Sequence, residues 1–251
     1  MSDSARRNRA YDDFRSVRSC VQSTISSQLH FFQEILLIKI YVFATPNSIR
    51  IPIMLEEIGL PYELKSVNVR KGEQKLPAHL AINPNGKVPV MIDSEGPSGK
   101  PFILTESGAI LIYLAEKTGQ LLPKDAFGQA RVMEQMFFHA SGIGPAFGQL
   151  GFFKRQAAEK IPLAIDRFQT EADRVLAVLD QVLSRSQYVA GDSFNIADIM
   201  HFGWLWRREF AMIDFQNTPN VGRWFAEISS REAVMRGVQK TEALVPAAHS
   251  R

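Results

Sequence analysis

The chain has 251 residues, enough for one large domain or two small ones, and its composition of 45% hydrophobic and 22% charged residues is typical of a globular protein with a substantial core. The net charge is only +3, and no stripe of lysine and arginine with interleaved aromatic residues occurs, so we expect no nucleic-acid partner. One cysteine and five scattered histidines predict no disulfide and no metal site, and no apolar run approaches the roughly 18–20 residues of a membrane span, so we expect a cytoplasmic protein without a membrane partner.

The first segment, residues 1–36, differs from the rest because it is rich in arginine and serine and has poor periodicity. Three interpretations are open: an extension packed on the body of the protein, a partly disordered arm, or upstream sequence translated from a misassigned start. We favour the misassigned start, because "LIKIYVFATP" reads as a natural beginning at a strand.

Residues 37–123 alternate between strand and helix patterns. Strands are predicted at 37–44, 62–69, 87–93 and 101–106, and helices at 47–59 and 107–119. The segment 71–86 is expected to be a loop with one helical turn, and the Gly/Pro-rich "SEGPSGK" is expected to connect two hairpin strands. The order predicts an α/β domain with a four-stranded mixed sheet and helices on both faces.

Residues 129–245 show only helical periodicity. In "IDRFQTEADRVLAVLDQVLS" the apolar positions Phe168, Ala172, Val175 and Leu179 fall on one helical face. We therefore predict a second, all-α domain, joined to the first by a hinge near "QLLPKDAFG".

The motif "NGKVPVMID" places a proline at the opening of a strand. A cis Val88–Pro89 bond would turn the backbone N–H and C=O of Val88 outward, where an extended peptide could pair with them. The alternative is a trans proline on an edge strand, which general statistics favour.

The motif "TESGAIL" places Glu106 and Ser107 where a strand runs into a helix. The free N–H groups of a helix start bind a carboxylate, and the Glu106 carboxylate beside them would bind an ammonium group. The pair therefore matches the head group of an α-amino acid, although a plain capping pair is the alternative.

The motif "TPNS" brings the Thr45 hydroxyl and the Asn47 amide to the start of another helix. Such groups favour a thiolate over a thiol, and so lower the pKa of a thiol placed beside them. The alternative is that these residues only cap the helix.

In this order and spacing, "TPNS…KGEQ…NPNGKVPV…ESGAILIYLAEKTG" resembles the glutathione transferase superfamily, and most of all its bacterial nu class of glutathione-dependent disulfide reductases. The segments "GPAFGQ", "EKIPLAIDRFQTEADRVLAVLD" and "FNIADI" extend the similarity to about residues 38–245. The resemblance implies a thioredoxin-like domain followed by a helical bundle, in a homodimer that binds glutathione.

The resemblance also implies roles in glutathione binding. Glu106 and Ser107 would hold its γ-glutamyl end, Val88 its cysteinyl backbone, and Gln74 with Lys87 its glycyl carboxylate. Arg167 matches a position that helps to bind glutathione in the nu class, with a salt bridge to a nearby acid as the alternative. Thr45 and Asn47 would face the sulfur.

Thioredoxins and glutaredoxins carry a catalytic cysteine pair at this turn, but this chain has none there. The resemblance therefore implies that the ligand supplies the reacting thiolate, and that the reaction is thiol–disulfide exchange on a small disulfide substrate. Three alternatives remain open. The first is a transferase, etherase or dehalogenase acting on a small electrophile, and the second is a non-catalytic glutathione-binding module. The third is a structural dimerisation fold with a vestigial pocket, which would bind no glutathione.

The acceptor side is less defined. Residues 142–153 break the helix pattern and are expected to line the acceptor pocket, and "GWLWRREF" either closes that pocket or packs on the bundle. Nu-class members often have a histidine soon after "GQ", where this chain has Gly151. Core packing is expected for Phe137 and Phe138, and His139 is expected to be a packed or surface residue rather than a base.

The segment "GDSFNIADI" is expected to be structural. Asn195 would cap a helix, and Asp198 three residues later would accept a bond from the backbone of the cap. We therefore predict that substitution of Asp198 impairs folding before it impairs chemistry.

Overall fold

The structure is a computed structural model that describes residues 38–245. The interpretations of residues 1–36, including the misassigned start, lie outside the described residues, and so does Cys20.

One four-stranded sheet forms the first half of the described chain. Its strands, in the spatial order β2-β1-β3-β4, are β1 (Ile38–Val42), β2 (Tyr62–Ser66), β3 (Val90–Asp93) and β4 (Phe102–Thr105). β1 runs parallel to β2 and antiparallel to β3, and β3 runs antiparallel to β4. The central strand β1 places Ile40 opposite both Leu64 and Met91. The predicted mixed sheet is confirmed.

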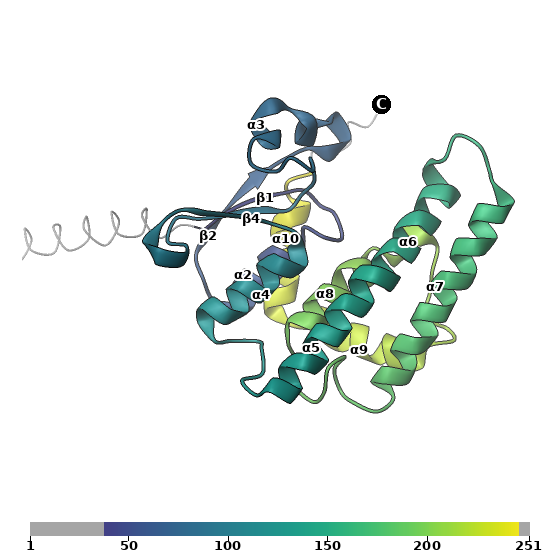
Figure 1. The fold of residues 1–251 in the computed structure, drawn as a ribbon. Helices are drawn as coiled ribbons and strands as arrows, with labels where there is room; N and C mark the ends of the chain where they lie inside the picture. Colours follow the sequence, from purple (N-terminus) through teal and green to yellow (C-terminus); the bar gives the residue numbers. More distant parts are fainter. Residues whose placement is uncertain (1–37, 246–251) are drawn as a thin grey trace, which may run out of the picture.

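Helices cover both faces of this sheet. They are α2 (Arg50–Ile58), α3 (Pro77–Leu80) and α4 (Ser107–Thr118), with short 3-10 turns at Val69–Lys71, Glu73–Lys75 and Pro97–Gly99. α2 and α4 lie on one side of the sheet, and α3 lies on the other (Figure 1). Met54 and Ile58 are buried on α2, which ends at Gly59 with a left-handed φ of 71°, as the sequence predicted.

The second half is built from helices. They are α5 (Ala126–Phe138), η4 (His139–Ile143), α6 (Gly144–Gly151), η5 (Phe152–Gln156), α7 (Pro162–Leu183), α8 (Ile196–Trp206), η6 (Arg208–Ala211), α9 (Pro219–Ser229) and α10 (Glu232–Glu242). η4 and η5 are π-helical turns, so the break predicted within residues 142–153 is a change of helical winding. Phe138 packs against the core, but Phe137 is 71% exposed and its predicted burial is wrong. It lies beside the α5 stripe of Val132, Gln135 and Met136 that faces inward.

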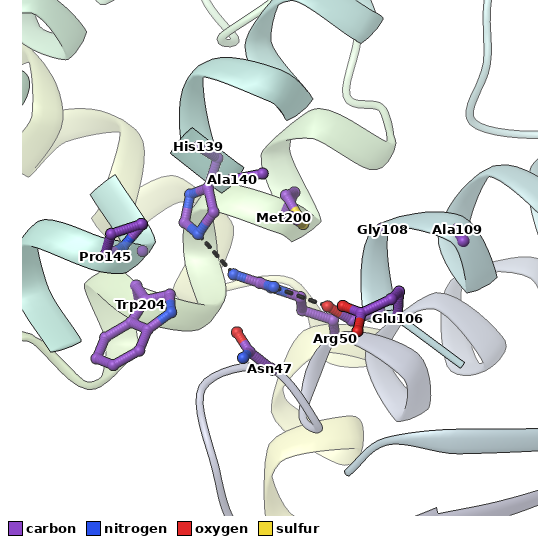
Figure 2. Close-up of a pocket in the computed structure, with 12 residues that line it drawn as sticks. Asn47, Arg50, Glu106, Gly108, Ala109, His139, Ala140, Pro145, Met200 and Trp204 are labelled. Carbon is purple, nitrogen blue, oxygen red and sulfur yellow. Dashed lines mark hydrogen bonds between the residues drawn. The ribbon is translucent and has the colours of Figure 1, made fainter. Parts of the chain in front are cut away.

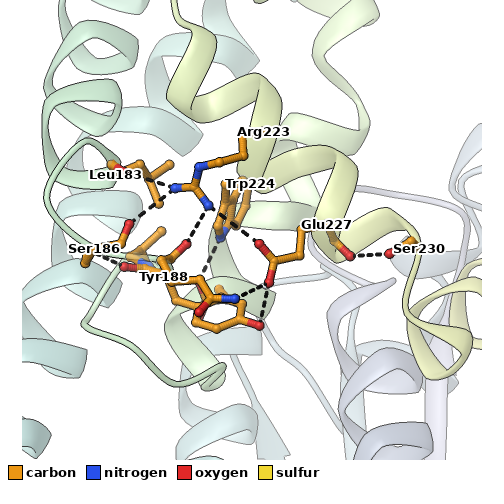
Figure 3. A network of polar contacts seen from close by, with 10 residues as sticks. Leu183, Ser186, Tyr188, Arg223, Trp224, Glu227 and Ser230 are labelled. Carbon is orange, nitrogen blue, oxygen red and sulfur yellow. Dashed lines mark hydrogen bonds and ion pairs between the residues drawn. The ribbon is translucent and has the colours of Figure 1, made fainter.

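α8 begins at the predicted capping box. The Asn195 side chain accepts a hydrogen bond from Ala197 N–H, and Asp198 accepts one from the Asn195 backbone. Asp198 also accepts from the Trp224 indole of α9 at 2.8 Å, and neighbouring Arg223 donates to the carbonyls of Leu183 and Ser186 (Figure 3). α9 is thereby fixed to the end of α7 and the start of α8.

α10 returns to the first half and packs on α2. Arg231 pairs with Glu57 at 2.7 Å, while Arg236 and Lys240 both pair with Glu56. The final helix therefore connects the two halves of the fold.

Candidate functional site

Two adjoining cavities lie where the carboxyl-terminal edge of the sheet meets the helical half. We call the first, of about 200 Å³, the polar cavity; it is lined by Asn47, Asn83, Asn85, Lys87, Val88, Pro89, Glu106 and Ser107. We call the second, of about 380 Å³, the junction cavity; it is lined by Asn47, Arg50, Glu106, Ser107, Gly108, Ala109, His139, Ala140, Gly144, Pro145, Met200 and Trp204. Asn47, Glu106 and Ser107 line both, so a ligand in one cavity can reach the other.

The loop before β3 shapes the polar cavity. The Val88–Pro89 bond is cis, so the first of the two interpretations is confirmed and the trans alternative is wrong. The carbonyl oxygen of Lys87 accepts the Asn83 side-chain amide at 2.9 Å and lies 2.9 Å from His79 Nε2. These contacts hold the segment that places Lys87 and Val88 at the cavity.

The turn before α2 supplies Asn47. Thr45 organises this turn, because its Oγ1 accepts from the Ser48 N–H at 3.2 Å and donates to Ser48 Oγ at 2.9 Å. The hydroxyl hydrogen of Thr45 is thus used inside the turn, and Thr45 lines neither cavity. Asn47, by contrast, points from the turn into the junction cavity (Figure 2).

The start of α4 supplies Glu106 and Ser107. Glu106 has a φ of 65°, a conformation that residues other than glycine adopt rarely and that often marks functional sites. Ser107 is the first residue of the helix and is buried. The free N–H groups of this helix start therefore lie at the point where the two cavities meet.

Arg50 and His139 form the floor of the junction cavity. Arg50 is only 2% exposed, donates to Ser107 Oγ at 2.8 Å, and lies 2.6 Å from His139 Nε2 (Figure 2). Burial lowers the pKa of Arg50 to about 9, so the guanidinium remains protonated at neutral pH. Burial, reinforced by the charge of Arg50, holds the pKa of His139 well below its usual value. His139 is therefore a packed neutral residue, one of the two placements expected for it.

The walls of the junction cavity come from the helical half. Met200 and Trp204 of α8 face Gly144 and Pro145 at the start of α6. Trp204 therefore closes the pocket, which was one of its two predicted roles. Nearby Arg208 instead packs over the rings of Phe215 and Phe225.

Gly151, the departure from the nu-class pattern, lies outside both cavities. A Cβ at this position would lie 2.2 Å from the ring of Phe210. The aromatic ring therefore occupies the space that a side chain at position 151 would need.

The structure brings five of the eight predicted site residues together at the cavities: Asn47, Lys87, Val88, Glu106 and Ser107. Thr45 lies in the adjoining turn. Gln74 lines neither cavity, but its buried Oε1 has no hydrogen-bond partner among the described residues. Arg167 is exposed on α7 and also lines neither cavity.

Sequence reasoning missed Arg50. A signal for it exists, because Arg50 lies four and eight residues before Met54 and Ile58, on the apolar face of α2. Its burial also needs Gly203, where a Cβ would lie 2.2 Å from the Pro46 carbonyl oxygen and 2.8 Å from Arg50 Nε.

Within residues 38–245, no group of three or more histidine, cysteine, aspartate or glutamate side chains is arranged to hold a metal ion. No helix in the same range is both long and apolar enough to cross a membrane.

Comparison with known proteins gives matches over both halves. Residues 38–116 match the family described as glutathione S-transferase, N-terminal domain, and residues 148–232 match glutathione S-transferase, C-terminal domain. Disulfide-bond oxidoreductase YfcG of Escherichia coli (strain K12) is 39% identical over 209 residues, which cover 82% of this chain and 96% of that protein.

Solved structures show the same similarity. A glutathione transferase from Burkholderia graminis, crystallised with two glutathione molecules per subunit, is 43% identical with a TM-score of 0.77, covering 80% of this chain and 87% of that one. A glutathione transferase from Pseudomonas putida, crystallised with one glutathione disulfide per subunit, is 38% identical with a TM-score of 0.78, covering 80% and 90% respectively.

Proposed function

The chain belongs to the glutathione S-transferase family, and from that premise we propose that it is a glutathione-dependent thiol–disulfide oxidoreductase or transferase. The observation that carries the proposal is the meeting of the two cavities at Asn47, Glu106 and Ser107, with no cysteine anywhere in the described chain. A site of this kind can bind a thiol and a second substrate side by side, but it cannot supply the thiol.

The residues present fit glutathione. Ser107 and the N–H groups at the start of α4 offer donors to a carboxylate, and the Glu106 carboxylate offers an acceptor to an ammonium group. Lys87 provides a positive charge on the other wall of the polar cavity, suited to the glycyl carboxylate. Gln74 lies outside both cavities, and only its amide nitrogen could donate to that carboxylate. We retain the predicted roles of Val88, toward the cysteinyl backbone, and of Arg167, whose exposed position outside both cavities makes it the least supported of the set.

Glutathione held at these residues would supply a thiolate. Its attack on a disulfide would form a mixed disulfide and release one thiolate, and a second glutathione would complete the reduction; attack on an electrophile would displace a leaving group or add across a double bond. The chain contributes the environment of that thiolate. The Asn47 amide lines both cavities and can donate to a thiolate placed where they meet, and the start of α2 adds a partial positive charge, so both favour the ionised form. Thr45 was predicted to act beside Asn47. We propose that it acts by shaping the turn, because its hydroxyl hydrogen is bonded to Ser48.

A specific observation also supports conjugation to small electrophiles as a second function. The junction cavity has apolar walls from Ala140, Pro145, Met200 and Trp204, which fit an apolar acceptor. The same thiolate would serve both reactions, and the acceptor decides between them.

Reduction of 2-hydroxyethyl disulfide by glutathione tests the proposal. We expect activity in the wild type and a loss of about 10- to 100-fold in Asn47→Ala, since a hydrogen bond to a charged group contributes about 1.5–3 kcal/mol. Asn217→Ala, at an exposed loop asparagine outside both cavities, serves as the matched control and should keep full activity. A wild type that binds glutathione but reduces no disulfide would favour conjugation, or a non-catalytic binding module.

We also propose that the protein is a homodimer. Phe127 and Phe137 on α5 are 73% and 71% exposed, and Ile103 on β4 is 46% exposed, so these large apolar side chains are available for a contact between subunits. Light scattering coupled to size-exclusion chromatography should give twice the mass of the chain, and a monomeric mass at micromolar concentration would reject the dimer.

The predicted domain division and location are proposals as well. The change from sheet to helices between Thr118 and Ala126 supports domains at 37–123 and 129–245, and limited proteolysis should cleave between them. The single cysteine supports a reducing, cytoplasmic location, which cell fractionation would test.

A further inference from the structure

Arg50 is a buried cation that forms no ion pair with another described residue. Its Nη1 donates to Ser107 Oγ and its Nη2 to His139 Nε2, and its Nε has no partner among the described residues. Neither partner is a carboxylate. Isolated buried charges are strongly unfavourable, so proteins pair them, neutralise them, or use them on a ligand.

The direction of each hydrogen bond in the cluster follows from Arg50, because a guanidinium can only donate. His139 Nε2 must therefore accept, which places the ring proton on Nδ1, 3.4 Å from His201 Nδ1. His201 in turn carries its proton on Nε2 and donates to the Gln135 carbonyl at 3.1 Å. Both rings are neutral, in agreement with their lowered pKa values, so the chain of contacts orients Arg50 without compensating its charge.

The same reasoning applies to Ser107. Its Oγ accepts from Arg50, so its hydroxyl hydrogen is left to donate elsewhere. Ser107 lines both cavities and begins α4, a helix of 12 residues. A hydroxyl donor, a helix start and a guanidinium behind them thus converge on one point, and all three favour a carboxylate.

We propose that Arg50 is a positioning residue for binding of the ligand's α-carboxylate at Ser107. It fixes the serine hydroxyl as a donor and supplies the positive charge that this carboxylate would otherwise lack. The inference rests on the proposed function, in which that carboxylate belongs to the γ-glutamyl end of glutathione. His139 and His201 hold the guanidinium in place from the opposite side.

Calorimetric titration with two ligands tests this role. The ligands are glutathione and 4-aminobutyryl-cysteinylglycine, which differs from glutathione only by the missing α-carboxylate. We expect Arg50→Met to weaken glutathione binding about 10- to 100-fold and analogue binding less than about threefold, since only the first ligand carries the anion. A merely structural arginine would weaken both ligands equally.

Arg50→Lys keeps the positive charge but has a shorter side chain. We expect the ratio of glutathione affinity to analogue affinity to fall about threefold in this variant. It also carries the test if Arg50→Met does not fold, because an unchanged ratio in Arg50→Lys would then overturn the inference. Arg131→Met, at an exposed arginine outside both cavities, is the matched control and should leave both affinities unchanged.

Equal losses for both ligands in Arg50→Met, or no loss for glutathione, would overturn the positioning role while leaving the proposed function intact. A wild type that binds neither ligand would instead overturn the proposed function, and this inference with it.

Discussion

The start of α8 and the floor of the junction cavity each bury one charged side chain, Asp198 and Arg50. Asp198 accepts from Val189 N–H, Asn195 N–H and the Trp224 indole, all within 3.0 Å, and lines neither cavity of the site. Arg50 has two neutral partners, an unpartnered Nε and a place at a cavity wall. We infer that the fully hydrogen-bonded Asp198 stabilises the fold, whereas the incompletely hydrogen-bonded Arg50 beside the cavity contributes to ligand binding.

The substitution with the largest expected effect is Asp198→Ala, which tests the structural role of this carboxylate. The substitution leaves three buried donors without an acceptor, and we expect the free energy of unfolding to fall by about 3–5 kcal/mol. Urea denaturation at neutral pH measures the loss. The folded fraction should bind glutathione with wild-type affinity, and a large loss of affinity with normal stability would contradict the structural role.

Acidification changes the free energy of unfolding in opposite directions at the two regions. Folded His139 and His201 have lowered pKa values, so below pH 6.5 the unfolded chain binds protons that the folded chain does not, and the free energy of unfolding falls by about 1.4 kcal/mol per pH unit for each histidine. Burial raises the pKa of Asp198 to about 6 from its usual 3.8, although three donors bind the carboxylate. Between pH 6 and 3.8 the folded chain therefore binds more protons at Asp198 than the unfolded chain, and this residue raises the free energy of unfolding as the pH falls.

The two histidines and Asp198 act in opposite directions, so their net effect is that of about one proton. We therefore expect the free energy of unfolding of the wild type to fall by about 1.4 kcal/mol between pH 6 and pH 5. His201→Phe should flatten this slope, and Asp198→Asn should steepen it, each by about one proton. Urea denaturation across this pH range gives the slopes directly. Parallel curves for all three proteins would contradict the assignment of neutral, buried histidines.

The smallest expected effect concerns a partly solvated charge. Glu56 binds Arg236, Lys240 and the Tyr62 hydroxyl, which lower its pKa to about 2 despite partial desolvation. The depressed pKa contributes stability above about pH 4.5 that is lost as pH falls toward 2. Both cations are about half exposed, so we expect Glu56→Gln to cost only about 0.5–1 kcal/mol at neutral pH, and less in 1 M salt.

A thermal-denaturation comparison of Glu56→Gln with the wild type at low and high salt measures that effect. A loss as large as that of Asp198→Ala would contradict the small contribution assigned to this partly exposed ion pair.

Much of the fold was predictable because its signals are local. A nearly continuous apolar run marked the central strand β1, Gly59 marked the end of α2, and Asn195 with Asp198 marked the start of α8. Phe137 was misplaced because two adjacent phenylalanines cannot share one face of a helix, and the sequence does not say which of them turns outward.

The site was predictable where its residues lie at element starts, as with Asn47, Glu106 and Ser107. The floor was not, because it assembles residues far apart in the chain: Arg50, His139 and His201 are separated by 89 and 62 positions. The Thr45 hydroxyl likewise could be placed at the turn, but the direction of its hydrogen depends on the Ser48 side chain.

The central claim is that the reacting thiol belongs to bound glutathione and not to the chain. The measurement that tests it most directly is glutathione-dependent reduction of 2-hydroxyethyl disulfide by wild type and Cys20→Ser, because Cys20 is the only cysteine. Our account predicts equal rates, within about twofold, since no protein thiol takes part. A loss of tenfold or more in Cys20→Ser would contradict the account and assign the nucleophile to the N-terminal segment.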